Sequence, residues 1–557
     1  MKKYIVRILA LSTLFVGCLF SSCSDDYMED LNTDPSKAPS IDPNAQLTTA
    51  QLQTYGDLGE VEIYRNYHYG FTQQLMGCWN TTNYGGHHTI DNNEMCRIWT
   101  SFYPNAVKNL VDGIYRTSED ASKNNINAAL RIYRVYMMSL ITDVYGDCPY
   151  SEAGLGFLDE KYNPRYDTQE EIYSDFFVEL KAAASQLSSA GDRLTGDIIF
   201  GGDINKWKKL ANSLRMRYAM RISNVAPDKA RIEFEDALNS DGGIMTSAGD
   251  DALIKYMDIA FSFGQESYSD YRGNAMSQLW FGNDPANNPS YICSTFFNQL
   301  KDTNDPRCYQ VCRFYYDGLM SATKPDGRID LTDEILSKGI KMEPCDPGTY
   351  SWDNWPAGYK SDILSEMAAN NPSIDPNMAR EVRPKLASAF LKGDCPGVVM
   401  TYAEVSFLLA EATLNGWVTN DNAESYYKKG VRAAMDFLSD NYDTEKVSTE
   451  EFENYMAANP FGYTTEQKRV NINTQAWIHH FTNPNECWAN LRRSGFPRLK
   501  SPEAYGQGAY LTGGVEIPVR LCYPVLESSY NKQGYDEALD RMGGSNSWNI
   551  PLWWDVN

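Results

Sequence analysis

Apolar side chains that recur every third or fourth residue constrain the fold of this chain more than any other feature. The segment 125–147, NINAALRIYRVYMMSLITDVYGD, shows this spacing and stops at Gly146. Such spacing places the apolar side chains on one face of an α-helix, and glycine commonly follows the last helical turn. The apolar stripe consists of Leu130, Tyr133, Met137, Leu140, Ile141 and Val144.

The same periodicity returns in five further segments. They span residues 166–187, 203–223, 401–416, 422–438 and 466–481. The first of them opens with an N-cap pattern at Asp167 and Thr168, followed by glutamates in the first turn. Paired helices of this length are typical of tetratricopeptide-like hairpins, although no strict consensus repeat is present. The predicted fold class is therefore mostly α, with a tetratricopeptide-like helical-hairpin scaffold and a long loop-rich insertion region.

The middle of the chain has a different composition. Residues 241–400 are rich in Gly, Pro, Asn, Asp and aromatic residues, as in FGNDPANNPSY, which predicts turns and loops. Loops this long on a helical scaffold are usually functional or disordered, and the Trp and Tyr content argues against disorder. We therefore expect an N-terminal helical scaffold over 46–240, a loop-rich recognition region over 241–400, and a C-terminal helical region over 401–557 that completes one unit.

The N-terminus predicts export and lipidation. A short basic start precedes an apolar run of signal-peptide length, which is too short for a stable membrane span. Small residues precede Cys23, as in a bacterial lipoprotein signal in which Cys23 becomes the acylated first residue. Cys18 is a rival lipidation site, and an ordinary cleaved signal with an incidental cysteine is the plainer alternative. The predicted parts are a signal peptide over 1–22 and a flexible tether over 23–45.

Composition narrows the classes of partner. The net charge of −23 repels phosphate backbones, so nucleic acid is not expected as a partner. The cysteines form no CxxC pair and the histidines form no HExxH motif, so neither a metal site nor a cofactor is predicted. Buried thiols are a simpler interpretation of the scattered cysteines than a disulfide framework. The 12 Trp and 37 Tyr residues suit a protein that binds sugars.

Charged and aromatic residues within the helical segments have a structural interpretation. Five charged residues lie within apolar helix stripes: Arg215, Arg217, Arg221, Glu404 and Glu411. We expect a buried ion-pair network from them rather than a charged active site, because a buried guanidinium requires a carboxylate partner. Three tryptophans at helical spacing are expected in the core: Trp207, Trp477 and Trp488.

Aromatic residues in the predicted loops are the candidate ligand-binding residues. An exposed ring offers a flat apolar face to a sugar, while neighbouring polar groups bond the hydroxyls. The alternative is that each ring only packs its own loop. The sequence does not single out a pair of carboxylates as the acid and nucleophile of a glycosidase, so no catalytic residue is proposed. The candidates are Trp79, Tyr84, Trp280, Tyr350, Trp352 and Trp355.

Several motifs in this order resemble the SusD/RagB family of nutrient-binding outer-membrane lipoproteins, and especially its SusD-like branch. The resemblance covers nearly the whole chain after Cys23 and is weakest over 240–390. The motifs include LNTDPS at 31–36, YGDCPYSEA at 145–153, WKKLANSLRMRYAMRIS at 207–223, TYAEVSFLLAEA at 401–412 and IPVRLCYPVLESSYN at 517–531.

The resemblance implies a non-enzymatic protein anchored by lipid in the outer membrane and facing the extracellular side. It further implies capture of oligosaccharides, or in some branches peptides, and a role as the lid of a SusC-like TonB-dependent transporter. Asp25 and Asp26, just after the lipidated cysteine, resemble the export signal of such lipoproteins. Two alternatives from other classes are a secreted helical glycoside hydrolase and a helical-repeat scaffold for protein interactions.

Overall fold

The computed structural model describes residues 41–259, 271–277, 291–316, 329–337, 343–351, 365–366, 368–370, 372 and 383–556. The predicted signal peptide, Cys23, most of the tether, Trp280, Trp352 and Trp355 lie outside the described residues. The first described helix, α3 (Pro43–Gly56), begins within the last residues of the predicted tether.

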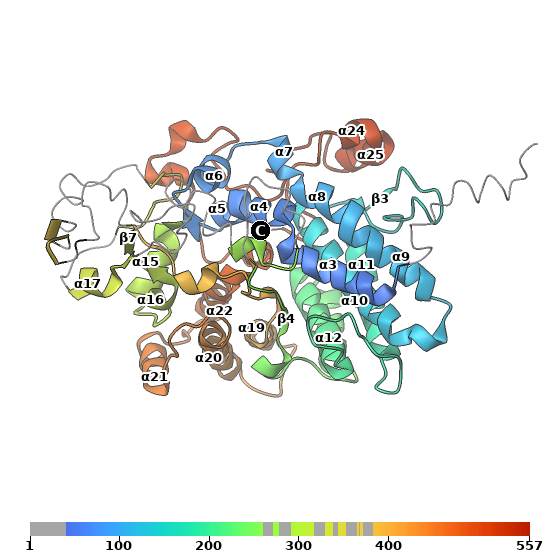
Figure 1. Ribbon diagram of the computed structural model, residues 1–557, viewed down its shortest axis with the longest axis horizontal. Coiled ribbons are helices and arrows are strands. Elements are labelled where there is room, and N and C mark those ends of the chain that lie inside the picture. The colour runs from blue at the N-terminus through green and yellow to red at the C-terminus, as the bar shows by residue number, and fades with distance from the viewer. Residues whose placement is uncertain are drawn as a thin grey trace, which may run out of the picture. The chain divides into compact units, whose positions relative to one another are not determined.

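Long helices of the N-terminal part pack as consecutive neighbours. Each of α9 to α12 contacts the next α-helix along the chain, and in Figure 1 α9, α10, α11 and α12 lie side by side. This arrangement confirms the helical-hairpin scaffold predicted from the periodicity. The bounds are α9 (Lys108–Thr117), α10 (Asn124–Tyr145), α11 (Gln169–Gln186), α12 (Ile204–Arg221) and α13 (Pro227–Leu238).

Local sequence explains where these helices start and stop. Gly146 follows α10 with a φ of 84°, a conformation that side-chain-bearing residues rarely adopt. Thr168 and Glu171 form a capping box at the start of α11, in which each side chain accepts a hydrogen bond from the other residue's backbone N–H. Asp203 caps α12 by accepting from the N–H groups of Asn205 and Lys206.

The C-terminal helices share their core with the N-terminal ones. Helix α19 packs against α20, α22 and α12, and α23 packs against α10. Trp207, Trp477 and Trp488 are at most 2% exposed, which confirms that they are core residues. The helices are α19 (Tyr402–Leu414), α20 (Ala423–Asn441), α21 (Thr449–Ala458), α22 (Thr465–His479), α23 (Pro484–Ser494), α24 (Glu527–Tyr530) and α25 (Lys532–Arg541).

Short helical elements fill the chain between α3 and α9, and three of them are π-helical. They are α4 (Leu58–Ile63), η1 (Tyr64–His68), α5 (Tyr69–Phe71), α6 (Trp79–Thr81), η2 (Thr82–Gly86), α7 (Asn92–Met95), α8 (Arg97–Phe102) and η3 (Tyr103–Val107), with η1, η2 and η3 forming the π-helices. The 3-10 turns elsewhere are η4 (Ala121–Lys123), η5 (Ala248–Asp250), η7 (Ser388–Leu391), η8 (His480–Thr482), η9 (Pro502–Tyr505) and η10 (Gly508–Tyr510).

The described parts of the loop-rich region are tied to the N-terminal part by a small antiparallel sheet in the order β1-β5-β9-β6. Its strands are β1 (Leu75–Met76), β5 (Tyr291–Ile292), β9 (Lys385–Leu386) and β6 (Cys312–Arg313). Three antiparallel pairs join β2 (Cys148–Pro149) to β3 (Tyr166–Asp167), β4 (Ala252–Ile254) to β10 (Gly397–Met400), and β7 (Tyr315–Tyr316) to β8 (Ile329–Asp330). Short helices complete this region: α15 (Ser294–Asp302), α16 (Cys308–Val311) and α17 (Thr332–Ser337).

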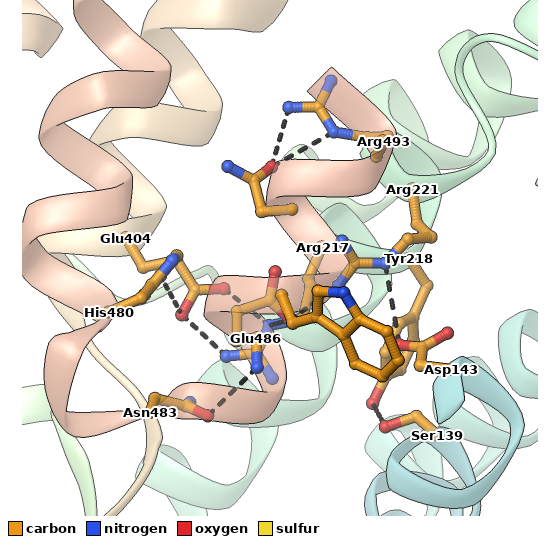
Figure 2. A network of polar contacts seen from close by, with 12 residues as sticks. Ser139, Asp143, Arg217, Tyr218, Arg221, Glu404, His480, Asn483, Glu486 and Arg493 are labelled. Carbon is orange, nitrogen blue, oxygen red and sulfur yellow. Dashed lines mark hydrogen bonds and ion pairs between the residues drawn. The ribbon is translucent and has the colours of Figure 1, made fainter. Parts of the chain in front are cut away.

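A buried ion-pair network links four helices (Figure 2). The Nε of Arg217 lies 2.5 Å from Oε1 of Glu404, and the two residues make a second bond of 2.7 Å. Arg221 donates to Oε2 of Glu486 at 2.6 Å and lies 3.6 Å from Asp143. Every one of these side chains is less than 10% exposed. The expected structural pairing of Arg217 and Arg221 is therefore confirmed.

Three members of the expected network pair with residues outside the expected set: Arg215, Arg221 and Glu411. Arg215 does not join Glu404 or Glu411; it contacts Asp236 at 2.5 Å and Glu233 at 3.0 Å. Arg215 lies two residues before Arg217, so the two side chains leave roughly opposite sides of α12 and Arg215 faces α13. Glu411 instead pairs with Arg493 of α23 through two bonds of 2.8 Å.

The described residues also show the state of the cysteine thiols and whether metal-binding clusters or membrane-spanning helices are present among them. The ten cysteines among the described residues carry free thiols, and all but Cys96 are buried. Within the described ranges, His, Cys, Asp and Glu side chains form no cluster that suits a metal ion. No helix among the described residues combines the length and apolarity needed to cross a membrane.

Candidate functional site, an aromatic surface

Five aromatic residues from three distant parts of the chain come together, and we call them the aromatic surface. Trp79 and Tyr84 meet edge to face with ring centroids 5.8 Å apart. The imidazole of His87 contacts the ring of Tyr350 edge to face at 5.5 Å and stacks on the ring of Tyr510 at 5.2 Å. The sequence placed three of these residues among its candidates, and the fold brings all three into one cluster.

The rings of the aromatic surface differ in exposure. Trp79 is 46% exposed and Tyr510 is 58% exposed. Tyr84 and Tyr350 are partly buried, and His87 is buried between the rings it contacts. Single exposed aromatic rings also occur elsewhere on this protein, so exposure by itself does not mark a site. Here the two open rings pack against fixed aromatic neighbours, and this arrangement favours a ligand platform.

Hydrogen bonds hold two of the chain segments, 77–87 and 348–351, side by side. The Oγ1 of Thr82 donates to the carbonyl of Thr349 at 2.9 Å, and the N–H of Ser351 donates to the carbonyl of Gly77 at 2.9 Å. A ring nitrogen of His87 lies 2.7 Å from the carbonyl oxygen of Gly348. These bonds fix Tyr350 beside η2 although the two segments are far apart in sequence.

The π-helix η2, which carries Tyr84, packs unusually closely on the chain before it. A Cβ atom added at Gly85 would lie 2.8 Å from the carbonyl oxygen of Tyr67 and 2.9 Å from the Cα of Gly70. Only glycine permits this approach of two backbones. Such π-helical turns occur frequently at functional sites, which agrees with the position of Tyr84.

Polar groups lie beside the aromatic rings. Burial, together with the nearby carboxylates of Glu94 and Asp91, raises the pKa of Tyr84. Glu94 accepts two hydrogen bonds from Arg97, at 2.7 and 2.8 Å, and one from Asn66 at 2.5 Å. A sugar lying on the rings would thus find charged and amide groups within the same surface.

Sequence reasoning missed His87 and Tyr510. The sequence context of Tyr510, AYGQGAYLTGG at 504–514, has the same glycine and tyrosine richness as the segment that carries Tyr84. That shared composition was the available indication for Tyr510. His87 adjoins the NTTNYGG segment directly but belongs to an adjacent histidine pair, which gave no sign of a role.

Comparison with known proteins identifies the family. The family described as "Starch-binding associating with outer membrane" matches residues 35–324 and 351–524 of this chain. The chain belongs to the SusD-like family. This assignment confirms the resemblance drawn from the motifs.

Solved SusD-like structures agree with the assignment. One, described as "Bacteroidetes AC2a SusD-like", is 48% identical, with a TM-score of 0.86 over 93% of this chain and 100% of that one. Another, described as a chitin-binding protein, is 31% identical with a TM-score of 0.75 over the same shares of the two chains. A SusD homologue from Bacteroides uniformis, at 22% identity and a TM-score of 0.71 over 93% and 100% of the two chains, shares the fold. The comparison with curated proteins gives no match.

Proposed function

We propose that this SusD-like protein captures oligosaccharides on its aromatic surface. The observation that carries the proposal is a pair of ring contacts on neighbouring segments: Trp79 packs on Tyr84, and His87 packs on Tyr350 and Tyr510. The rings of Trp79 and Tyr510 are open to solvent. Pyranose rings present apolar C–H faces that stack on such rings. The descriptions of the family and of the chitin-binding relative support a carbohydrate ligand over a peptide.

The surroundings of the aromatic surface favour binding over hydrolysis. Glycosidases use two carboxyl groups that flank the scissile bond. Three carboxylates lie near Tyr84. Asp91 caps α7 by accepting from two backbone N–H groups, Glu94 is bonded to Arg97 and Asn66, and Glu62 pairs with Arg65. All three thus have structural partners, which supports a protein that holds the glycan without cleaving it.

We further propose that the protein is anchored on the extracellular side of the outer membrane and acts as the lid of a SusC-like TonB-dependent transporter. The family description, which names association with the outer membrane, supports the location. The small residues before Cys23 support lipidation at this cysteine, since they resemble a lipoprotein signal. An acylated cysteine that carries several acyl chains binds a membrane stably, whereas a single chain binds only marginally.

Replacement of Trp79 by alanine tests the glycan site. We expect the mature protein to bind an oligosaccharide with a free energy of about −8 to −4 kcal/mol, since shallow hydrated sites rarely bind more tightly. Trp79→Ala should weaken this binding about tenfold or more, because a stacked ring is lost, while the melting temperature stays near that of wild type. Isothermal titration with a panel that includes maltohexaose and chitohexaose measures both affinities.

Tyr115→Ala is the matched control, because Tyr115 is a 60% exposed aromatic residue on α9, outside the aromatic surface. It should bind as wild type does. Equal affinities of Trp79→Ala and wild type would remove the aromatic surface from the binding site. The release of reducing ends on long incubation would favour the hydrolase alternative.

Replacement of Cys23 by alanine tests the anchor. The variant should leave the membrane fraction or retain an uncut signal, because the acylated thiol is gone. Alanines at Asp25 and Asp26 should preserve acylation but lower display at the surface, measured by protease accessibility on whole cells. A Cys23→Ala protein that is still acylated would identify Cys18 as the lipidated residue, and unchanged accessibility would refute the sorting role of the two aspartates.

A further inference from the structure

A polar pocket of about 510 Å³ lies among the helices of the scaffold and shares no residue with the aromatic surface. It is formed where α13 begins, α19 ends and α23 ends, with α22 along one side. Two aromatic side chains, Trp417 and Phe496, line it together with the amides Asn224 and Asn415. Its volume falls within the usual range for small-molecule sites, roughly 300–1,000 Å³.

The innermost charges of this pocket are already satisfied. Arg493 and Glu411 make two bonds of 2.8 Å, and Arg493 also donates to Asn473 and Asn490. Both members of the pair are less than 10% exposed at their side chains. Because these donors and acceptors are used within the protein, the pair shapes the pocket wall and leaves ligand binding to other groups.

Arg469 is the group in the pocket with unused binding capacity. Its guanidinium donates one hydrogen bond, 2.7 Å to Oδ1 of Asn415, and it forms no ion pair with any residue that the structure describes. A guanidinium has five N–H donors arranged as a planar fork that matches a carboxylate. Arg469 is only partly buried, so it remains accessible from the pocket.

Two carboxylates line the pocket near Arg469. Glu411 interacts with Arg469 electrostatically but makes its ion pair with Arg493. Glu466 has a partner of its own. Glu466 lies one helical turn earlier on α22, but its carboxylate is 3.6 Å from the guanidinium of Arg498. The side chain of Glu466 is 59% exposed, so water screens it as well. Among the residues that the structure describes, the pocket therefore combines the guanidinium of Arg469, the amides of three asparagines and two aromatic rings.

We propose that this pocket binds the carboxylate of a small acidic saccharide, such as a uronic acid, on Arg469. The guanidinium takes the carboxylate through paired hydrogen bonds, which are the strongest polar contacts that a protein offers to such a group. Asn224 and Asn415 bond the hydroxyls, and Trp417 and Phe496 cover the apolar face of the sugar ring. The site is independent of the proposed glycan site on the aromatic surface.

Binding of monosaccharides to the mature protein tests the pocket. The probes are D-glucuronate and D-galacturonate, compared with glucose and galactose, by titration calorimetry or ligand-observed NMR. Wild type should bind each uronate at least tenfold more tightly than its neutral counterpart. Arg469→Gln should remove this preference, because it keeps an amide but loses the charge, whereas Arg469→Lys should retain part of it.

Two controls separate this proposal from the function proposed above. Arg231→Gln removes an exposed arginine of α13 and should leave uronate binding unchanged. Trp79→Ala should also leave it unchanged, because Trp79 belongs to the aromatic surface. Equal binding of acidic and neutral sugars by wild type, an unchanged preference in Arg469→Gln, or loss of uronate binding in Trp79→Ala would each overturn the proposal. The comparison on wild type holds even where a variant fails to fold.

Discussion

Replacement of Arg217 by alanine should lower the free energy of unfolding by about 3–5 kcal/mol, the scale for stranding one member of a buried ion pair. Burial by itself raises the pKa of Glu404, because it disfavours the charged carboxylate. Arg217 and His480 outweigh this effect and hold the pKa at about 2. Without Arg217, the carboxylate is left only 4% exposed beside His480, and the carbonyl of Val399 loses its 2.7 Å hydrogen bond. Urea denaturation followed by tryptophan fluorescence measures the loss.

Arg231→Ala is the matched control for this experiment. Arg231 pairs with Glu235 at 3.2 Å on the surface of α13, with both side chains more than a third exposed. Such a pair contributes little, so the control should lose less than about 0.5 kcal/mol. Glycan affinity should be unchanged in the folded fraction of Arg217→Ala. A variant that denatures like wild type but no longer binds glycan would show that Arg217 belongs to the binding site and not to the scaffold.

Mild acid should destabilise the protein because buried histidines are kept neutral. Burial, aided by His480, lowers the pKa of His479 to about 3, and burial next to Arg492 lowers that of His68 well below 6.5. In the unfolded chain each histidine binds a proton below pH 6.5, whereas the folded protein does not. Protonation therefore stabilises the unfolded state relative to the folded state as pH falls from 6.5 towards 3. Each histidine should cost about 2 kcal/mol between pH 6.5 and 5.

Glu404 adds a second pH range, at lower pH, in which stability is lost. Its folded pKa of about 2 lies below the usual value of 4.5, so its contribution is complete above pH 4.5 and is lost as pH falls towards 2. Urea midpoints at pH 7, 6 and 5 cover the histidine window. In the same range the buried Asp251, whose pKa burial raises to about 7, offsets part of the loss because the folded protein takes up its proton first. His479→Gln should be less stable at pH 7, where the contact with Thr401 is altered, but should show a flatter pH dependence. Equal wild-type midpoints at pH 7 and pH 5 would contradict this account.

The sequence was most informative where one local pattern decides the outcome. The stripe from Leu130 to Val144 requires a helix, and Gly146 ends it because glycine adopts a positive φ without strain. Thr168 and Glu171 lie within one turn of each other, so their capping box is readable without any tertiary knowledge. The two-residue strands of the sheet are too short to show a periodicity, so they could not be predicted from the sequence.

The candidate site depended on contacts that no local pattern records. Tyr84 and Tyr510 are separated by several hundred residues, and His87 joins their neighbourhoods only in the folded chain. The sequence suggested Trp79, Tyr84 and Tyr350 because of the polar, glycine-bearing stretches around them, a property of composition alone. The partner of Arg215 was likewise missed, because the choice between α13 and α19 depends on how the helices pack around α12.

A crystal structure of the mature protein with an oligosaccharide that binds in the titration is the most direct test of the central claim. The account predicts an intact glycan with at least one sugar ring within about 4 Å of Trp79 or Tyr510, the contact distance of stacked apolar groups. The guanidinium of Arg97, which lies near Tyr84 and is a third exposed, should lie toward the hydroxyls of the glycan. A glycan bound on another face of the protein, or a cleaved product, would contradict it.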